Sequence, residues 1–204
     1  INKYMGFPVS IDSNYYCEIA ADMSLLFDEK NIRQNRPLYM LIGALLAYPV
    51  NKFFNIIGFD YSKFDYQISK NKGQNKKIRN QSKIPIFVGF ILLNGIFILT
   101  VLLLFDNILK QSKVSQSVIL YSSSFLLFNI IIKQYFWTAH TQLLIILSPI
   151  VAIWLMMFLS NTKSHISEFK LFIVCLLSGL LILLYGMFVI LLPIIFLSII
   201  LNNL

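Results

Sequence analysis

The second half of this chain is almost free of charged side chains. From Pro85 to Leu204, 120 residues carry only seven Asp, Glu, Lys or Arg. Over all 204 residues, 57% are hydrophobic and 13% are charged, whereas a soluble domain has about 45–50% apolar and about 25% charged residues. Apolar runs of this length are typical of helices that cross a bilayer, because a helix satisfies its own backbone hydrogen bonds. The sequence therefore argues against a soluble enzyme and against disorder, and it predicts an all-α, polytopic bundle of transmembrane helices.

Five to six spans are expected between residues 37 and 204. Residues 37–58 hold an apolar run that a proline and a lysine interrupt, as in a kinked or tilted crossing. Pro85–Phe105 is a clean span of 21 residues, which matches about 30 Å of hydrocarbon. Residues 171–201 carry no charge and fit either two helices that meet near Tyr185 or one long tilted helix. The other expected segments are a short or partial span at 117–132, a span at 141–160, and polar connections at 106–116 and 161–170.

The formal net charge of +8 is concentrated in one segment. Residues 60–84 contain seven Lys or Arg side chains, which only Asp60 and Asp65 oppose. A basic segment between apolar runs is typical of a cytoplasmic loop, and it can attract anionic lipid. Nucleic-acid binding is not expected, because residues 70–83 contain no aromatic side chain on which bases would stack. Residues 1–36, one crossing away, are then expected to form an external loop.

Within this external loop, residues 11–29 are expected to form an amphipathic helix. Ser10 or Asp12 can cap its start. Apolar side chains recur there at helical spacing, and they are Tyr16, Ile19, Met23, Leu26 and Phe27. Such a helix fits a membrane surface, and a protein partner could also dock on it.

The external loop also concentrates side chains that could perform chemistry. Asp12 is a candidate general base for an acceptor hydroxyl or amine, although an acidic residue at this place is more ordinarily an N-cap. Arg33 and Arg36 could hold a phosphate through paired hydrogen bonds, or they could anchor a helix end at lipid headgroups. Glu18 and Asp22 share a helix face, but two carboxylates without a third ligand are weak evidence for a metal, and no metal is expected.

Side chains later in the chain are weaker candidates. His140 lies beside Trp137 at a span end and is either an aromatic-belt residue or a contact to a lipid phosphate or a substrate. If residues 117–132 cross the membrane fully, His140 lies in the cytoplasm; if they are re-entrant, it stays outside. Lys133 snorkels to the interface unless an anionic group lies nearby. The two cysteines are too few for a disulfide framework, and Cys175 is expected to be a buried thiol.

Two short motifs in the N-terminal part resemble a known family. The stretch DSNYY at residues 12–16, with Ile19-Ala20 after it, and the stretch RPLY at residues 36–39 are similar to the first external loop of the GT-C superfamily of membrane glycosyltransferases. Residues 138–142 and 178–181 also resemble later membrane segments of such proteins. Members usually have a helix before this loop and are usually longer, so the chain is expected to be a fragment.

The resemblance implies a transferase of a bacterial inner membrane, which moves a sugar from a polyprenyl-phosphate carrier to an acceptor on the non-cytoplasmic side. It implies Asp12 as the catalytic base. The implied substrate contacts are Tyr16, Glu18, Arg33, Arg36, Lys133 and His140. The lipid-linked sugar donor is then the substrate and membrane lipid the surrounding partner, with no separate cofactor expected.

Two other classes of function stay open at this point. The chain could be a non-catalytic membrane subunit that docks a partner through residues 1–36. A transporter or flippase is less favoured, because the spans from Pro85 onward hold almost no ionisable side chains, which transport paths usually contain.

Overall fold

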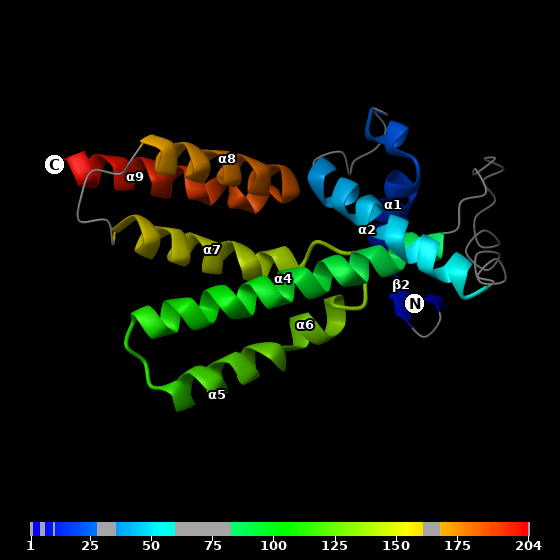
Figure 1. Ribbon diagram of the computed structural model, residues 1–204, viewed down its shortest axis with the longest axis horizontal. Helices are drawn as coiled ribbons and strands as arrows, with labels where there is room; N and C mark the ends of the chain where they lie inside the picture. Colours follow the sequence, from blue (N-terminus) through cyan, green and yellow to red (C-terminus); the bar gives the residue numbers. More distant parts are fainter. Residues whose placement is uncertain are drawn as a thin grey trace. The chain divides into compact units, whose positions relative to one another are not determined.

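The computed structural model describes residues 2–4, 7–9, 11–27, 36–59, 83–160 and 168–203. Two three-residue strands, β1 (Asn2–Tyr4) and β2 (Phe7–Val9), pair antiparallel. The helices are α1 (Ile11–Ala21), η1 (Met23–Phe27), α2 (Pro37–Ile56), α4 (Lys83–Gln111), α5 (Gln116–Leu127), α6 (Ile130–Tyr135), α7 (Leu143–Ser160), α8 (Glu168–Leu184), η2 (Gly186–Ile190) and α9 (Leu191–Asn203) (Figure 1). Helices dominate the described residues, so the prediction of an all-α fold is confirmed, with a small unexpected hairpin. Residues 60–82, most of the predicted basic loop, lie outside the described ranges.

The chain divides into two compact units. The first contains Ile1–Gly95 and Gln134–His140, and the second contains Ile96–Lys133 and Thr141–Leu204. α2 packs against α1 and belongs to the first unit, not with the later apolar helices. The structural division therefore falls within α4.

α4 is longer than predicted at both ends. It begins two residues earlier than expected, at Lys83, and continues to Gln111, through residues that were expected to form a connection. Lys110 Nζ lies 2.7 Å from Asp106 Oδ2, and an ion pair at this i,i+4 spacing supports the added turns. In the described part of the chain, this 29-residue helix is the one found to be long and apolar enough to cross a membrane.

The predicted helix over residues 11–29 is divided in two. α1 ends just before Asp22, and the 3-10 helix η1 follows. Asp22 Oδ1 accepts hydrogen bonds from the backbone N of Ser24 at 3.1 Å and from its Oγ at 2.6 Å, so the carboxylate starts a new turn. Tyr16 is buried as the apolar spacing predicted, but Phe27 is 86% exposed. The amphipathic helix is thus shorter than predicted, and its buried stripe ends before η1.

Two of the predicted apolar runs are also interrupted. Between α5 and α6, Asn129 Oδ1 accepts a hydrogen bond from the backbone N of Ile131 at 2.8 Å and caps the next helix, so residues 117–132 form two short helices. Between α8 and η2, Tyr185 has extended dihedral angles, with φ −159° and ψ 121°. Residues 171–201 therefore form two helices that meet at Tyr185 and not one long helix.

Close backbone contact joins α2 and α4 within the first unit. Tyr39 stacks on Phe90 with ring centroids 4.9 Å apart, and both side chains are fully buried. Gly89 lies so near α2 that an added Cβ would be 2.7 Å from the backbone O of Gly43 and 2.8 Å from the backbone N of Ala47. The approach of two backbones therefore requires glycine at position 89.

Replacing Gly89 by alanine is expected to lower the stability of the first unit by about 1–3 kcal/mol, because the added methyl group overlaps backbone that cannot move without displacing a helix. The matched control is Gly95→Ala in the same helix. There the nearest atom to an added Cβ is a ring carbon of Phe136 at 3.9 Å, and the helix propensity of alanine contributes up to about 1 kcal/mol. Thermal unfolding of the detergent-solubilised protein, followed by circular dichroism, measures both variants. Equal midpoints would contradict the close α2–α4 contact.

Candidate functional site

Tyr16 and Arg36 link α1 to the start of α2. Tyr16 is fully buried, and its hydroxyl accepts a hydrogen bond from Arg36 Nη1. Its ring packs edge-on against Tyr39, with centroids 5.3 Å apart. Arg36 directly precedes Pro37, which opens α2 at the position where proline is favoured in helices. The guanidinium is therefore held at a defined place beside the first turn of α2.

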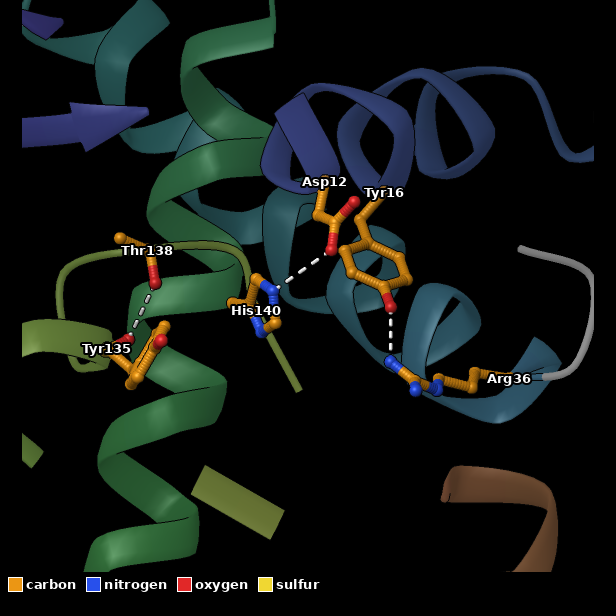
Figure 2. Close-up of polar contacts among 6 residues, drawn as sticks. All are labelled: Asp12, Tyr16, Arg36, Tyr135, Thr138 and His140. Atoms are coloured by element: carbon orange, nitrogen blue, oxygen red, sulfur yellow. Dashed lines mark hydrogen bonds and ion pairs between the residues drawn. The ribbon is translucent and has the colours of Figure 1, made fainter. Parts of the chain in front are cut away.

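Asp12 and His140 are separated by 128 positions in the sequence and meet in the first unit (Figure 2). His140 Nε2 lies 3.1 Å from Asp12 Oδ2, and the His140 and Asp12 side chains are 12% and 27% exposed. Asp12 and Tyr16 lie on one face of α1, because helical residues four apart are neighbours. Asp12 is the second residue of α1, so it lies inside the first turn and not at the N-cap position.

A buried amide from α4 holds the segment that carries His140. Asn94 is fully buried. Its Nδ2 points to three backbone carbonyls, those of Tyr135 at 3.3 Å, Phe136 at 2.9 Å and Thr138 at 2.7 Å. Thr138 Oγ1 also donates to the Tyr135 carbonyl at 2.9 Å (Figure 2). Within the described residues Asn94 Oδ1 has no hydrogen-bond partner, so this amide acts through its nitrogen.

Aromatic rings confine the His140 imidazole. Tyr135 lies on one side with ring centroids 5.3 Å apart, and Tyr16 lies edge-on with centroids 6.3 Å apart. These apolar surfaces lower the local dielectric, which strengthens the electrostatic interaction of the imidazole with Asp12. Asp12, Tyr16, Arg36 and His140, four of the predicted site residues, are thus brought together in one place.

Glu18, which was also predicted as a substrate contact, forms an ion pair with Lys83. Lys83 Nζ lies 2.9 Å from Glu18 Oε1, and the lysine and glutamate side chains are 11% and 38% exposed. Lys83 was counted in the predicted cytoplasmic loop and Glu18 in the predicted external loop. The contact thus joins a residue of the predicted cytoplasmic loop to a residue of the predicted external loop.

The remaining candidates do not join the site. Lys133 is exposed and belongs to the second unit, while Arg33 lies outside the described residues. Glu18 and Asp22 gather no third ligand: in the ranges that the structure describes, no three His, Cys, Asp or Glu side chains form a group that could hold a metal. An apolar pocket in the second unit is lined by Phe97, Ile98, Val101, Ile132, Leu143 and Ile146, and it offers no polar side chain.

Two residues that organise the site were missed from the sequence. Lys83 was indistinguishable from the other basic residues of its segment. Asn94 did give a signal, because it is an amide in the middle of the apolar run Pro85–Phe105, and polar side chains at such places are usually paired.

The cysteines differ from expectation and from each other. Cys17 is buried on α1, and Cys175 on α8, predicted to be buried, is exposed. Burial raises the pKa of the Cys17 thiol from 9.0 to about 12, because removal from water disfavours the charged thiolate. The nearby Lys83 cation opposes this shift and the Glu18 carboxylate adds to it.

No known protein family, curated protein or solved structure matches the chain. The chemistry of the site must then be argued from its side chains. A carboxylate and an imidazole in contact can together accept a proton from a hydroxyl, and a positioned guanidinium can bind a phosphate through its N–H donors. The arrangement therefore combines a proton acceptor with an anion-binding group.

Alkylation of Cys17 by iodoacetamide is expected to stay slow in the folded protein as the pH rises from about 7 to about 9, because the folded thiol remains protonated over this range. In the unfolded protein the thiolate fraction, and with it the rate, rises about tenfold per pH unit below the ordinary pKa. The Cys175→Ser variant isolates this signal, and mass spectrometry measures it. Above pH 9.0 the unfolded thiol loses its proton, whereas the folded thiol keeps it until the pH approaches 12. The contribution of the buried thiol to the free energy of unfolding is therefore complete below pH 9.0 and is lost as the pH rises toward 12. Equal rates in folded and unfolded protein would contradict the burial of Cys17.

Replacing Asn94 by leucine is expected to destabilise the protein by about 2–4 kcal/mol, because buried carbonyls lose their donor. Thr100→Val is the matched control: Thr100 lies in the same helix, and its Oγ1 donates to the Ile96 carbonyl at 2.8 Å, an acceptor within its own helix. Thermal unfolding in detergent compares the two. A midpoint for Asn94→Leu as high as that of Thr100→Val would show that the amide does not hold residues 135–138.

Proposed function

We propose that this chain is a membrane-embedded, GT-C-like glycosyltransferase, which moves a sugar from a polyprenyl-phosphate carrier to an acceptor on the non-cytoplasmic side of a bacterial inner membrane. The observation that carries the proposal is the contact between Asp12 and His140 at 3.1 Å, next to the Tyr16–Arg36 pair. It supports a proton acceptor and a phosphate-binding group within one small region.

Asp12 is the proposed general base. When His140 Nε2 carries a proton, it donates to Asp12 Oδ2 and fixes the direction in which the carboxylate points, which is the role of an orienting partner in catalytic couples. The acceptor hydroxyl oxygen forms a bond to the anomeric carbon of the sugar, and its proton passes to Asp12. The bond between the anomeric carbon and the carrier phosphate oxygen breaks, and its electron pair leaves with the phosphate. Proximity and base catalysis together lower the barrier.

Arg36 is the proposed contact to the carrier phosphate. Negative charge grows on that phosphate as the sugar departs, so a cation placed there stabilises the transition state more than the ground state. The hydrogen bond of Nη1 to the buried Tyr16 hydroxyl fixes the guanidinium before the donor arrives. Tyr16 thereby acts as a positioning residue.

The carrier's hydrocarbon chain requires a membrane. α4 meets the length and composition of a spanning helix, and we propose that α5 with α6, α7, α8, and η2 with α9 complete a polytopic bundle of five crossings. The latter helices are short for about 30 Å of hydrocarbon, a mismatch that local thinning of the bilayer accommodates. Exposed apolar side chains on these helices, among them Phe125, Phe172 and Phe196, then face lipid.

Asp12→Asn is expected to reduce sugar transfer by about 10²- to 10⁴-fold, because the amide keeps the shape of the carboxylate but cannot accept the proton. The matched control is Asp22→Asn, which changes the carboxylate that directly follows the end of the same helix and keeps a side-chain oxygen that can accept the hydrogen bonds from Ser24. Membranes that contain the full protein are supplied with polyprenyl-phosphate-linked radiolabelled glucose or mannose, and release of the sugar from the carrier is counted.

Wild-type activity in the Asp12→Asn variant, at equal protein level, would remove Asp12 from the chemistry and favour a non-catalytic membrane subunit. Equal loss in both aspartate variants would show that the effect is structural.

A further inference from the structure

Two contacts in the first unit determine which elements share a face of the membrane. The first is the ion pair between Glu18 of α1 and Lys83, the first residue of α4, at 2.9 Å. A pair at this distance cannot be separated by a hydrocarbon core about 30 Å thick. α1 and the N-terminal end of α4 therefore lie on the same face.

The second contact is independent of the first. Asp12 of α1 meets His140 at 3.1 Å, and Asn94 of α4 is bonded to the segment just before His140. The chain leaves the first unit at Gly95 and re-enters it at Gln134. The contact with Asp12 places His140 on the same face as α1, so α4 crosses the membrane and α5 with α6 returns across it.

α2 lies between two residues that both contact α1. Arg36, just before α2, is bonded to Tyr16 of α1, and Lys83, at the start of the next described helix, is bonded to Glu18 of α1. Between Arg36 and Lys83 the chain must cross the membrane an even number of times. The 23 residues 60–82 contain eight charged side chains, which excludes a second apolar span there. The even number is therefore zero, and α2 does not cross.

We propose that α2 lies along the surface of the bilayer, on the face that holds Asp12, with its outer side against lipid. On the outer side of α2, exposed residues recur at helical spacing, and all of them but one lysine are aliphatic or aromatic. These residues are Leu41, Leu45, Tyr48, Lys52 and Ile56. A tyrosine and a lysine among aliphatic residues are typical of a helix that lies in the interface. The opposite side, with Tyr39, Met40, Gly43 and Ala47, is buried. The proposal needs the membrane bundle but not the transferase chemistry.

Side-specific labelling tests the shared face. In the Cys175→Ser background, single cysteines are introduced at Phe27 in η1, at Gln67 between α2 and α4, and at Ser115 before α5. Intact cells that express the full chain are treated with a membrane-impermeant maleimide, and the parent variant, whose Cys17 is buried, serves as the blank. If the face of Asp12 is the non-cytoplasmic one, as the proposed transferase requires, Phe27→Cys and Gln67→Cys are expected to react in intact cells, and Ser115→Cys only after permeabilisation.

If Gln67→Cys needs permeabilisation while Phe27→Cys does not, α2 crosses and the proposal is overturned. If Ser115→Cys reacts in intact cells and the other two do not, the shared face is supported but is the cytoplasmic one, which would contradict the proposed transferase. Because no step of this test measures sugar transfer, its failure is distinct from failure of the proposed transferase.

The depth of α2 provides a second measurement. Spin labels at Leu45 and Ile56, eleven positions apart, are expected to lie at similar depth in a helix parallel to the surface. The matched control is the pair Leu92 and Leu103 in α4, which has the same spacing and is also exposed. The control pair should differ in depth by about 16 Å if α4 stands along the membrane normal. A depth difference for the α2 pair as large as for the α4 pair would overturn the proposal.

Discussion

A single buried amide determines where the chain returns to its first unit. Asn94 lies in an apolar helix, where a polar group without a partner costs free energy. Its nitrogen is 2.7 Å from the Thr138 carbonyl and 2.9 Å from the Phe136 carbonyl, and residues 136–142 form no regular helix. These carbonyls need a donor as much as the amide needs acceptors. Their mutual satisfaction brings His140 to α1, and the arrangement of the site depends on it.

α1 is the element on which the polar contacts converge. It has only 11 residues, too few to be stable alone, and it is held by its buried face and by three side-chain contacts to other segments. Asp12 meets the segment before α7, Tyr16 meets the residue before α2, and Glu18 meets the start of α4. The helix spacing of these three residues presents them to different neighbours. A proton-accepting couple, a positioned guanidinium and a structural ion pair therefore occupy one short helix.

Local patterns in the sequence were enough for the fold class and for several candidate residues. Hydrophobic runs predicted the helices, and the division of residues 171–201 at Tyr185 was one of two stated possibilities. The helix limits were less well predicted, because side-chain hydrogen bonds decide them: Asp22 ends α1 by bonding Ser24, and the Asp106–Lys110 pair extends α4. The two segments were assigned to opposite faces of a membrane from the density of basic residues alone, and that pattern did not contain the Glu18–Lys83 contact.

The sequence by itself determined that this protein is a helical, strongly apolar chain with its ionisable candidates gathered in the N-terminal part, since composition and periodicity are properties of neighbouring residues. It marked Asp12, Tyr16, Arg36 and His140 individually. Only the tertiary structure decided that they meet, that Glu18 is paired with a lysine, and that Arg36 rests on a buried tyrosine. The physical reason is that a contact across 128 positions depends on how helices pack and how buried carbonyls are satisfied, and no local pattern contains that information.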